Sequence, residues 1–453
     1  MCARSGLPSV LGVLTRLFAP VLVAVLVAAS VLAWPRSASA HGVGDTTEVR
    51  LAQTIAGTEL TVVIRQVVRV PGPLRIDVVA YHPVRDLTIA VRVGQESDTV
   101  RLLPGRAGSH PLVLGVDEVG PHELRLHAGG ELSVLPFRVL VPRAAPWERL
   151  VHGGFAGAAA LLLGALLAAA TARRAPAVLL GGGAGAAMVM ALTVALLSAR
   201  FPPAQPDGAL PTAPGGPLGR PYVQARIATT PATPVVGGRF TVRLDLVDGS
   251  TGRPVDDLVL HHAALAHLVV TSPDGEFFRH VHPTRTVAGR LAVGLTVDRP
   301  GRYLVSAEVE RVESGGQLVS GEFTVTGPPL PRQLRDEAVP ATVRLGSPVA
   351  GRPTTIELDA GRDDLQRWLG MAGHLIVRDE EGGFLGHVHE AGSMATDPGR
   401  QEADETVADH GPTLRFTFTF PEPGRYLAWA QYVRDYRIVT VPFVVTVGTE
   451  DAR

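Results

Sequence analysis

The chain has 453 residues, enough for roughly two to four domains that each bury a core of their own. Its formal net charge of -1 at pH 7 gives no electrostatic reason to expect a nucleic-acid partner. The one cysteine, Cys2, stands at the N-terminus, so the remaining chain has no disulfide, no thiolate metal site and no cysteine nucleophile.

Residues 1–40 have the pattern of a secretory signal peptide. Arg4 and Arg16 give a positive start, residues 17–34 are apolar, and residues 38–40 (Ala-Ser-Ala) fit the small-x-small rule for cleavage. The alternative is an uncleaved membrane anchor. Residues 41–146 then alternate apolar and polar positions in short runs separated by turn sequences such as Gly129-Gly130. This spacing predicts an N-terminal extracytoplasmic β-sandwich.

Residues 147–200 predict a transmembrane helical hairpin. Two apolar runs, about 150–172 and about 176–199, are each long enough to cross a hydrocarbon core of about 30 Å. Arg173 and Arg174 between them favour a cytoplasmic turn, which places both flanking regions outside. Apart from His152 at the edge, the helices carry no ionisable residue, so they predict an anchor and no ion path. Their glycines predict close packing of the two helices: Gly157, Gly164, Gly181, Gly182, Gly183 and Gly185.

After a Pro- and Gly-rich linker at 201–221, the rest of the chain is an internal repeat. PVVGGRFTVRLD at 234–245 corresponds to PVAGRPTTIELD at 348–359, and PGRYL occurs at both 300–304 and 423–427. The strand patterning predicts two similar β-sandwiches, repeat 1 over 222–328 and repeat 2 over 339–449. The whole chain is therefore expected to be mainly β, with three immunoglobulin-like or cupredoxin-like sandwiches and a two-helix transmembrane hairpin.

Each repeat contains the same histidine pattern, His-x12-His-x-His. A hairpin turn centred on Asp274-Gly275 would bring the first histidine opposite the third, and the second shares the face of the third because side chains alternate. Glu381-Gly382 occupies the turn position of the second copy. Three imidazoles would then project from one side of each ribbon, close enough to bind one ion. The predicted metal ligands are His267, His280 and His282 in repeat 1, and His374, His387 and His389 in repeat 2.

Neutral imidazoles without thiolates suit Cu(II), Zn or Ni, and Cu(II) leads the affinity order. Copper is therefore the expected cofactor, and zinc the alternative. Extra ligands could come from the following side chains: His261, His262, Met371, Glu390 and His410. The competing interpretation is that the histidines only pack or hydrogen-bond in a duplicated sandwich.

Cleavage after Ala40 would leave His41 with a free α-amine, one arm of a copper histidine brace. The second arm would need a histidine of the N-terminal domain: His82, His110, His122 or His127.

The two repeats resemble the exported bacterial β-sandwich modules called YtkA-like or FixH-like. The likeness covers about 222–447 and rests on the histidine pattern with Pro283, on Pro300-Gly301-Arg302-Tyr303, and on Trp429-Ala430-Gln431-Tyr432. It implies metal handling in copper- or oxidase-related settings. The N-terminal domain resembles CopC-type copper carriers through His41 and its sandwich pattern.

These observations predict a non-enzymatic, membrane-anchored, extracytoplasmic protein that captures, buffers or delivers copper. Its expected partners are the lipid bilayer, a metal ion and a membrane protein such as an oxidase or a metal transporter, with no nucleic acid. One alternative is a structural adaptor whose sandwiches make protein–protein contacts. A third is a copper-dependent redox enzyme that uses His41. The patterns of hydrolases and kinases do not stand out, so no catalytic residue is predicted.

Overall fold

The computed structural model describes residues 48–65, 67–201, 205–209, 222–312, 314–331, 341–393 and 404–449. The expected signal peptide (1–40), His41 and most of the linker at 201–221 lie outside the described residues. The chain forms two compact units, one containing Pro142–Asp207 and the other combining Thr47–Val141 with Gly208–Arg453. The expected fold class is confirmed: antiparallel β-sheets dominate and two long apolar helices interrupt them.

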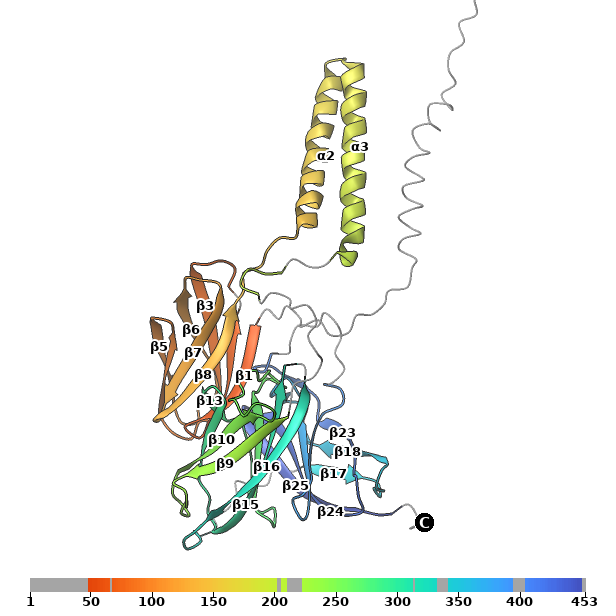
Figure 1. Cartoon of the computed structure of the whole chain (residues 1–453). Helices are drawn as coiled ribbons and strands as arrows, with labels where there is room; N and C mark the ends of the chain where they lie inside the picture. Colours follow the sequence, from red (N-terminus) through yellow and green to blue (C-terminus); the bar gives the residue numbers. More distant parts are fainter. Residues whose placement is uncertain are drawn as a thin grey trace, which may run out of the picture. The chain divides into compact units, whose positions relative to one another are not determined.

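The first unit contains a helical hairpin, α2 (Pro146–Ala170) and α3 (Arg174–Leu197), which continues into the short helix η1 (Ser198–Arg200). The two helices run alongside each other in Figure 1. Among the described residues, these two are long and apolar enough to cross a membrane. Most of their apolar side chains are exposed, including Leu167 and Leu179. Such a surface is unlike that of the core helices of soluble domains, which bury their apolar face.

Small residues do bring α2 and α3 together, but not all of the expected glycines take part. A Cβ atom on Gly154 would lie 2.8 Å from that of Ala191, and one on Gly164 would lie 3.3 Å from Leu180. Gly183 faces Leu161 in the same way. A Cβ atom on any of the other expected glycines would have no neighbour within 4 Å: Gly157, Gly181, Gly182 and Gly185.

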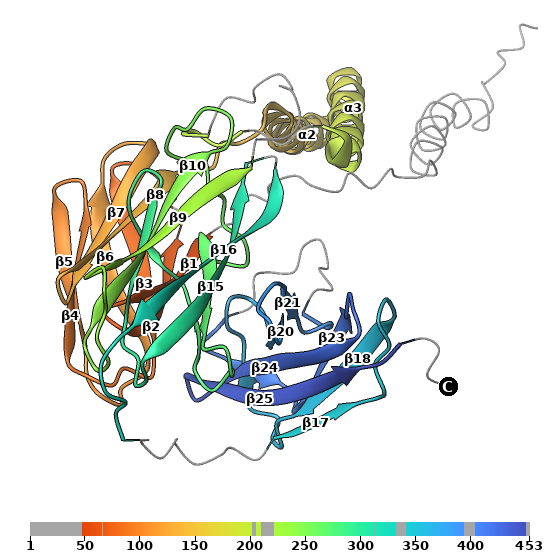
Figure 2. The ribbon, with the colours of Figure 1, turned by 60° about the horizontal axis from the view of Figure 1, so that its bottom comes forward.

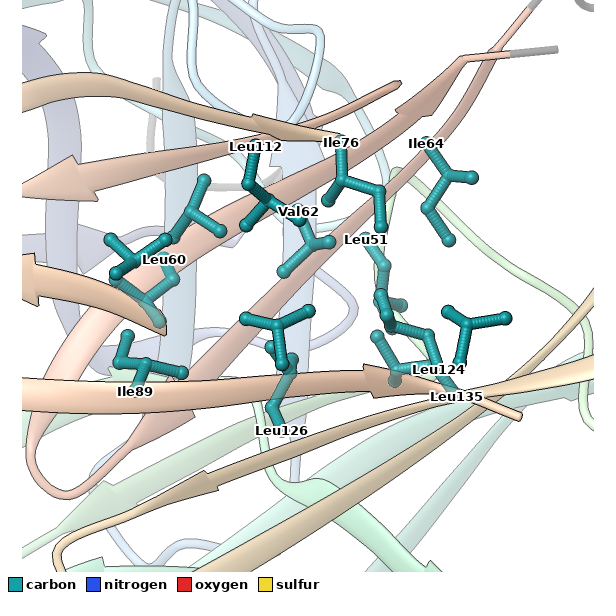
Figure 3. Packing of buried hydrophobic residues seen from close by; sticks show 14 of the residues in the cluster. Leu51, Leu60, Val62, Ile64, Ile76, Ile89, Leu112, Leu124, Leu126 and Leu135 are labelled. Carbon is teal, nitrogen blue, oxygen red and sulfur yellow. The ribbon is translucent and has the colours of Figure 1, made fainter. Parts of the chain in front are cut away.

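The N-terminal sandwich packs the sheet β1-β2-β3-β6 against the sheet β5-β4-β7-β8. Strand β4 alternates buried and exposed residues throughout, so the sheet that contains it buries one face. Strands β1 and β2 instead bury consecutive residues, and Ala52 and Val63 belong to a second apolar cluster on the other face of their sheet. Figure 3 shows the leucine, isoleucine and valine side chains that fill the space between the sheets. The strands are β1 (Glu48–Ile55), β2 (Thr58–Arg65), β3 (Gly72–Tyr81), β4 (Leu87–Val93), β5 (Glu96–Leu102), β6 (Gly108–Val116), β7 (Gly120–Ala128) and β8 (Glu131–Val139).

Repeat 1 packs the sheet β13-β14-β10-β9 against the sheet β12-β11-β15-β16. Its core includes Phe240, Tyr303 and Phe323. The Tyr303 hydroxyl donates a hydrogen bond to the backbone oxygen of Arg299, 2.8 Å away. The strands are β9 (Val223–Thr230), β10 (Phe240–Asp248), β11 (Ala266–Thr271), β12 (Phe278–Val281), β13 (Thr284–Val287), β14 (Arg290–Leu295), β15 (Gly301–Arg311) and β16 (Gly315–Val325).

Repeat 2 has the same plan, with the sheet β17-β18-β23 facing the sheet that contains β21, β20, β24 and β25. Figure 2 shows β20, β21, β24 and β25 together. Tyr426 repeats the hydrogen bond of Tyr303, at 2.9 Å to the backbone oxygen of Glu422. The strands are β17 (Thr342–Leu345), β18 (Pro353–Asp359), β19 (Leu365–Gln366), β20 (His374–Asp379), β21 (Leu385–His389), β22 (Ala408–His410), β23 (Thr413–Thr419), β24 (Gly424–Arg434) and β25 (Arg437–Val447).

The two repeats meet through their histidine hairpins in a pseudo-twofold arrangement. The hairpin tip at Gly275 packs on Leu427 of β24, and the equivalent tip at Gly382 packs on Leu304 of β15. Each of these glycines has a positive φ, and a side chain on either would collide with the leucine. Reciprocal contacts of this kind are the signature of an isologous interface, here formed within one chain.

Candidate metal centre

The two hairpins have the register that the turn sequences predict. In repeat 1, β11 pairs with β12 so that Leu268 faces Val281, which aligns His267 with His282. In repeat 2, His374 faces His389 directly. The prediction that the three imidazoles of each hairpin share one face is therefore confirmed.

The six histidines of the two hairpins form one cluster at the pseudo-twofold axis. The His280 and His387 rings, one from each repeat, have centroids 5.1 Å apart, and His267 is 5.1 Å from His387. Within repeat 2, His387 and His389 are 4.7 Å apart. Among the described residues, two sets have ligand atoms within 4.8 Å of one another, and both contain His387: the first adds His267 and His280, and the second adds His374 and His389. The sequence suggested a separate set of three ligands in each repeat, whereas the fold brings the two sets together around His387.

Each ring has an inner nitrogen, which faces the other histidines, and an outer nitrogen, which faces away from them. In five of the six rings the outer nitrogen donates a hydrogen bond to a fixed acceptor. The Nε2 atoms of His267 and His374 lie 3.0 Å from the backbone oxygens of His261 and Trp368. The remaining three rings use Nδ1: His280 to Gln431 Oε1 at 2.9 Å, His387 to Glu308 Oε2 at 3.1 Å, and His282 to Glu59 Oε1 at 2.6 Å. Because a neutral imidazole has a single N–H, these acceptors fix the tautomers.

The inner nitrogens therefore point their lone pairs at one another. His267 Nδ1 lies 3.2 Å from both His280 Nε2 and His282 Nε2. In repeat 2, His374 Nδ1 lies 3.3 Å from His387 Nε2. No proton remains for these contacts when the outer nitrogens hold theirs. Two imidazoles bound to a tetrahedral ion at about 2.0–2.1 Å have nitrogens about 3.3 Å apart, so the spacing matches that of ligands around a cation.

Burial keeps five of the six histidines neutral. The pKa values of His267, His280, His374 and His387 are well below the ordinary value, chiefly because the rings are desolvated and secondarily because the histidines repel one another's charge. Desolvation lowers the pKa of His389 to about 3. Neutral rings are the form that binds metal, so protons do not compete for the lone pairs near neutral pH.

The N-terminal sandwich completes the surroundings of His282. Besides the bond from the His282 ring to Glu59, the backbone N–H of His282 donates to Thr54 Oγ1 at 3.0 Å. The Thr54 N–H donates to the His282 oxygen at 2.7 Å. The Thr54 hydroxyl in turn donates to the second carboxylate oxygen of Glu59 at 2.5 Å. Residues of strands β1 and β2 thus fix the position of His282 through hydrogen bonds to its backbone and ring.

The extra ligands suggested by the sequence have different locations. His261 and His262 lie beside the cluster, and the His262 ring is 3.9 Å from that of His389. Glu390 instead accepts hydrogen bonds from the backbone N–H groups of Gly392 and Ser393, and its nearest histidine is His410 at 3.7 Å.

Met371 lies in the tight turn that begins at Trp368, which corresponds to the His261–Ala264 turn of repeat 1. It is therefore the counterpart of Ala264.

The suggested partners of the copper brace lie in the N-terminal sandwich, apart from the cluster. His122 Nε2 is 3.0 Å from the Glu118 backbone oxygen, and His82 Nε2 is 3.4 Å from a guanidinium nitrogen of Arg437. His110 and His127 lie on β6 and β7. None of them joins a metal-binding set among the described residues. His41 lies outside those residues, so the brace stays a prediction.

The sequence did not indicate the three side chains that accept hydrogen bonds from the outer nitrogens: Glu59, Glu308 and Gln431. Gln431 stands in the Trp429–Tyr432 segment, and Glu308 occupies the corresponding position of repeat 1, opposite His267. Alignment of the two repeats would have drawn attention to both positions. Glu59 comes from a domain without the repeat pattern and gave no such signal.

Comparison with known proteins adds no function. A profile of a family described as a domain of unknown function, DUF8832, matches residues 224–328 and again residues 336–449. No curated protein matches the sequence.

Among solved structures, the chain is similar to bacterial invasin, described as an integrin-binding protein, at 10% identity and a TM-score of 0.16. It is also similar to dimeric latent PorU from Porphyromonas gingivalis at 9% identity and a TM-score of 0.17. The alignments cover 86% and 89% of this chain, and 60% and 34% of those proteins.

Proposed function

We propose that this chain is a membrane-anchored, extracytoplasmic metal-binding protein, and that Cu(II) is the ion which its histidine cluster captures or buffers, with Zn(II) as the alternative. The observation that carries the proposal is the convergence of imidazole lone pairs at 3.2–3.3 Å. Backbone, amide and carboxylate acceptors hold the outer N–H groups, which is the usual way in which proteins orient metal-binding histidines.

The all-nitrogen set suits Cu(II) and Zn(II) rather than the hard cations, which prefer oxygen. We expect one tightly bound ion per chain. His387 belongs to both ligand sets, and its Nδ1–H is donated to Glu308, so it has one lone pair to offer. The ion would be shared by the two repeats.

The anchoring part of the proposal rests on α2 and α3. Residues before and after this hairpin, Thr47–Val141 and Gly208–Arg453, fold into one compact unit. They must therefore lie on the same side of any membrane that the helices cross, as a pair of spans permits. The Arg173-Arg174 turn then faces the cytoplasm and the unit faces outward.

The test is metal titration of the detergent-solubilised full chain with Cu(II) and Zn(II), followed by electron paramagnetic resonance of the copper form. We expect one ion of sub-micromolar affinity and hyperfine coupling to several nitrogens. The double variant His280→Gln/His387→Gln should lose this binding, whereas the matched control His122→Gln/His410→Gln should retain it. Weak binding that is equal in both variants would reject the metal proposal and favour the structural adaptor.

A further inference from the structure

We propose that His261, His262 and His389 form an exchange site through which the metal ion enters and leaves the buried cluster. This inference rests on the proposed function, because it concerns access to the same ion. The cluster needs such a route: His282 and His374 are fully buried, and the side chain of His387 is 3% exposed.

The three imidazoles make a continuous path from the surface to the cluster. The His261 side chain is 30% exposed, and its ring centroid is 4.0 Å from that of His262. His262 lies 3.9 Å from His389, which in turn lies 5.0 Å from His374 and 4.7 Å from His387. The Nε2 atom of His389 is buried and has no hydrogen-bond partner in the described part of the chain. Its lone pair or proton is therefore uncommitted.

Two carboxylates flank the outer end of this path. The Nδ1 atom of His261 lies 2.8 Å from a carboxylate oxygen of Glu310, and its Nε2 lies 3.7 Å from Glu308 Oε1. The other oxygen of Glu308 accepts the hydrogen bond from His387. Glu308 thus contacts both the exposed end of the path and the buried cluster. Negative charge at the mouth of a site raises the local concentration of cations.

The equivalent turn of repeat 2 presents apolar side chains to the cluster. In repeat 2 the positions of His261 and His262 are taken by Trp368 and Leu369, each 1% exposed. The Trp368 ring contacts His374 at 5.0 Å and Tyr81 of the N-terminal sandwich at 6.4 Å. Trp368 and Leu369 belong to an apolar cluster that also contains Ala52, Val63 and Val79. A cation beside these side chains would lose its hydration without gaining ligands, so this turn offers no route.

The two repeats therefore differ in the chemistry of the side chains that these turns carry. The duplicated turns occupy equivalent places in the two repeats, but one presents imidazoles and the other presents indole and isobutyl groups. A metal ion can move between imidazoles by exchanging one ligand at a time, which avoids a fully dehydrated and unligated state. Such ligand exchange can proceed at the turn that bears the imidazoles.

The test compares the rates of Cu(II) loading and of removal by excess EDTA in the full chain, by stopped-flow fluorescence. Trp368 lies within 5.5 Å of three cluster histidines, so bound Cu(II) should quench it and report occupancy. The variants are His262→Asn, in which asparagine tolerates the positive φ of 45° at this position, and His261→Gln. His410→Gln is the matched control, since His410 is also partly exposed but lies outside the path.

We expect both variants to slow loading and removal by about tenfold or more while the equilibrium affinity and stoichiometry stay as in the unsubstituted chain. Unchanged rates would overturn the exchange site and leave the metal function intact. A loss of affinity as large as that of His280→Gln/His387→Gln would also overturn it, because it would make these residues permanent ligands. Absence of tight binding in the unsubstituted chain would instead reject the proposed function itself.

Discussion

Glu308 and Gln431 occupy equivalent positions on β15 and β24, and each accepts a hydrogen bond from a histidine of the opposite repeat. Glu308 holds His387 at 3.1 Å, and Gln431 holds His280 at 2.9 Å. Each is also the cross-strand neighbour of the first histidine of its own repeat, His267 or His374. Each repeat therefore positions one proposed metal ligand of the other.

This reciprocity predicts how charge at the two positions tunes the site. A carboxylate acceptor makes the imidazole a better donor to a cation than a neutral amide does. We expect Glu308→Gln to weaken Cu(II) binding by about tenfold and Gln431→Glu to strengthen it by a similar factor. The measurement is competition titration against a chelator of known affinity.

The double exchange Glu308→Gln/Gln431→Glu is the matched control, because it moves the charge across the pseudo-twofold axis without changing the total. Its affinity should return close to that of the unsubstituted chain. Equal affinity in all four proteins would show that these residues only fill space.

The stability of the metal-free protein should fall in mild acid. Desolvation is the chief cause of the lowered pKa values of His267, His280, His374 and His387, and of the values of about 4 for His262 and about 3 for His389. These six histidines are therefore neutral in the fold. In the unfolded chain they take up protons near pH 6.5. The stabilisation is therefore fully present above about pH 6.5 and is lost as the pH falls below it.

Below about pH 6.5, each histidine that stays neutral in the folded protein lowers the free energy of unfolding by about 1.4 kcal/mol for every unit by which the pH falls. Thermal unfolding followed by circular dichroism between about pH 7 and about pH 4.5 measures the effect. Addition of saturating Zn(II) should raise the melting temperature at the upper end of the range and have less effect at the lower end. A melting temperature that stays constant down to about pH 5 would contradict neutral burial of the cluster.

Glu59 should couple the N-terminal sandwich to the cluster. In Glu59→Ala the buried Nδ1–H of His282 loses its acceptor, which costs about 1–3 kcal/mol. We expect faster hydrogen exchange in both β1 and the segment around His282, because Thr54 links them. Glu59→Gln keeps an acceptor and should exchange much more slowly than the alanine variant. Arg302→Gln, which removes an exposed ion pair with Glu322, is the control. Faster hydrogen exchange that is confined to β2 would argue against coupling between the N-terminal sandwich and the cluster.

The proposed topology can be read by cysteine labelling in a Cys2→Ser background, which contains no other cysteine. Thr171→Cys places a thiol in the turn between α2 and α3, and Ser250→Cys places one on the outer β-sandwich unit. An impermeant maleimide should label the Ser250 variant in intact spheroplasts and the Thr171 variant only after permeabilisation. Labelling of both before permeabilisation would exclude a membrane-spanning hairpin with an inward turn.

Local patterns in the sequence determined the hairpins. Asp274-Gly275 and Glu381-Gly382 centre the turns, and strand alternation then places three imidazoles of each repeat on one face. The two apolar runs were equally explicit, because their length and composition alone specify helices α2 and α3. These features depend on neighbours in the chain, which is why the sequence could predict them.

Tertiary packing decided what the histidines do together. The sequence suggested two separate ligand sets, but the pseudo-twofold interface merges them around His387 and brings in Gln431 across it. Glu59 is separated from His282 by the entire helical hairpin, and no local pattern connects them. Histidines spaced along a strand determine which face the imidazoles share, but only the docking of three sandwiches determines which lone pairs converge, because that depends on contacts between residues hundreds of positions apart.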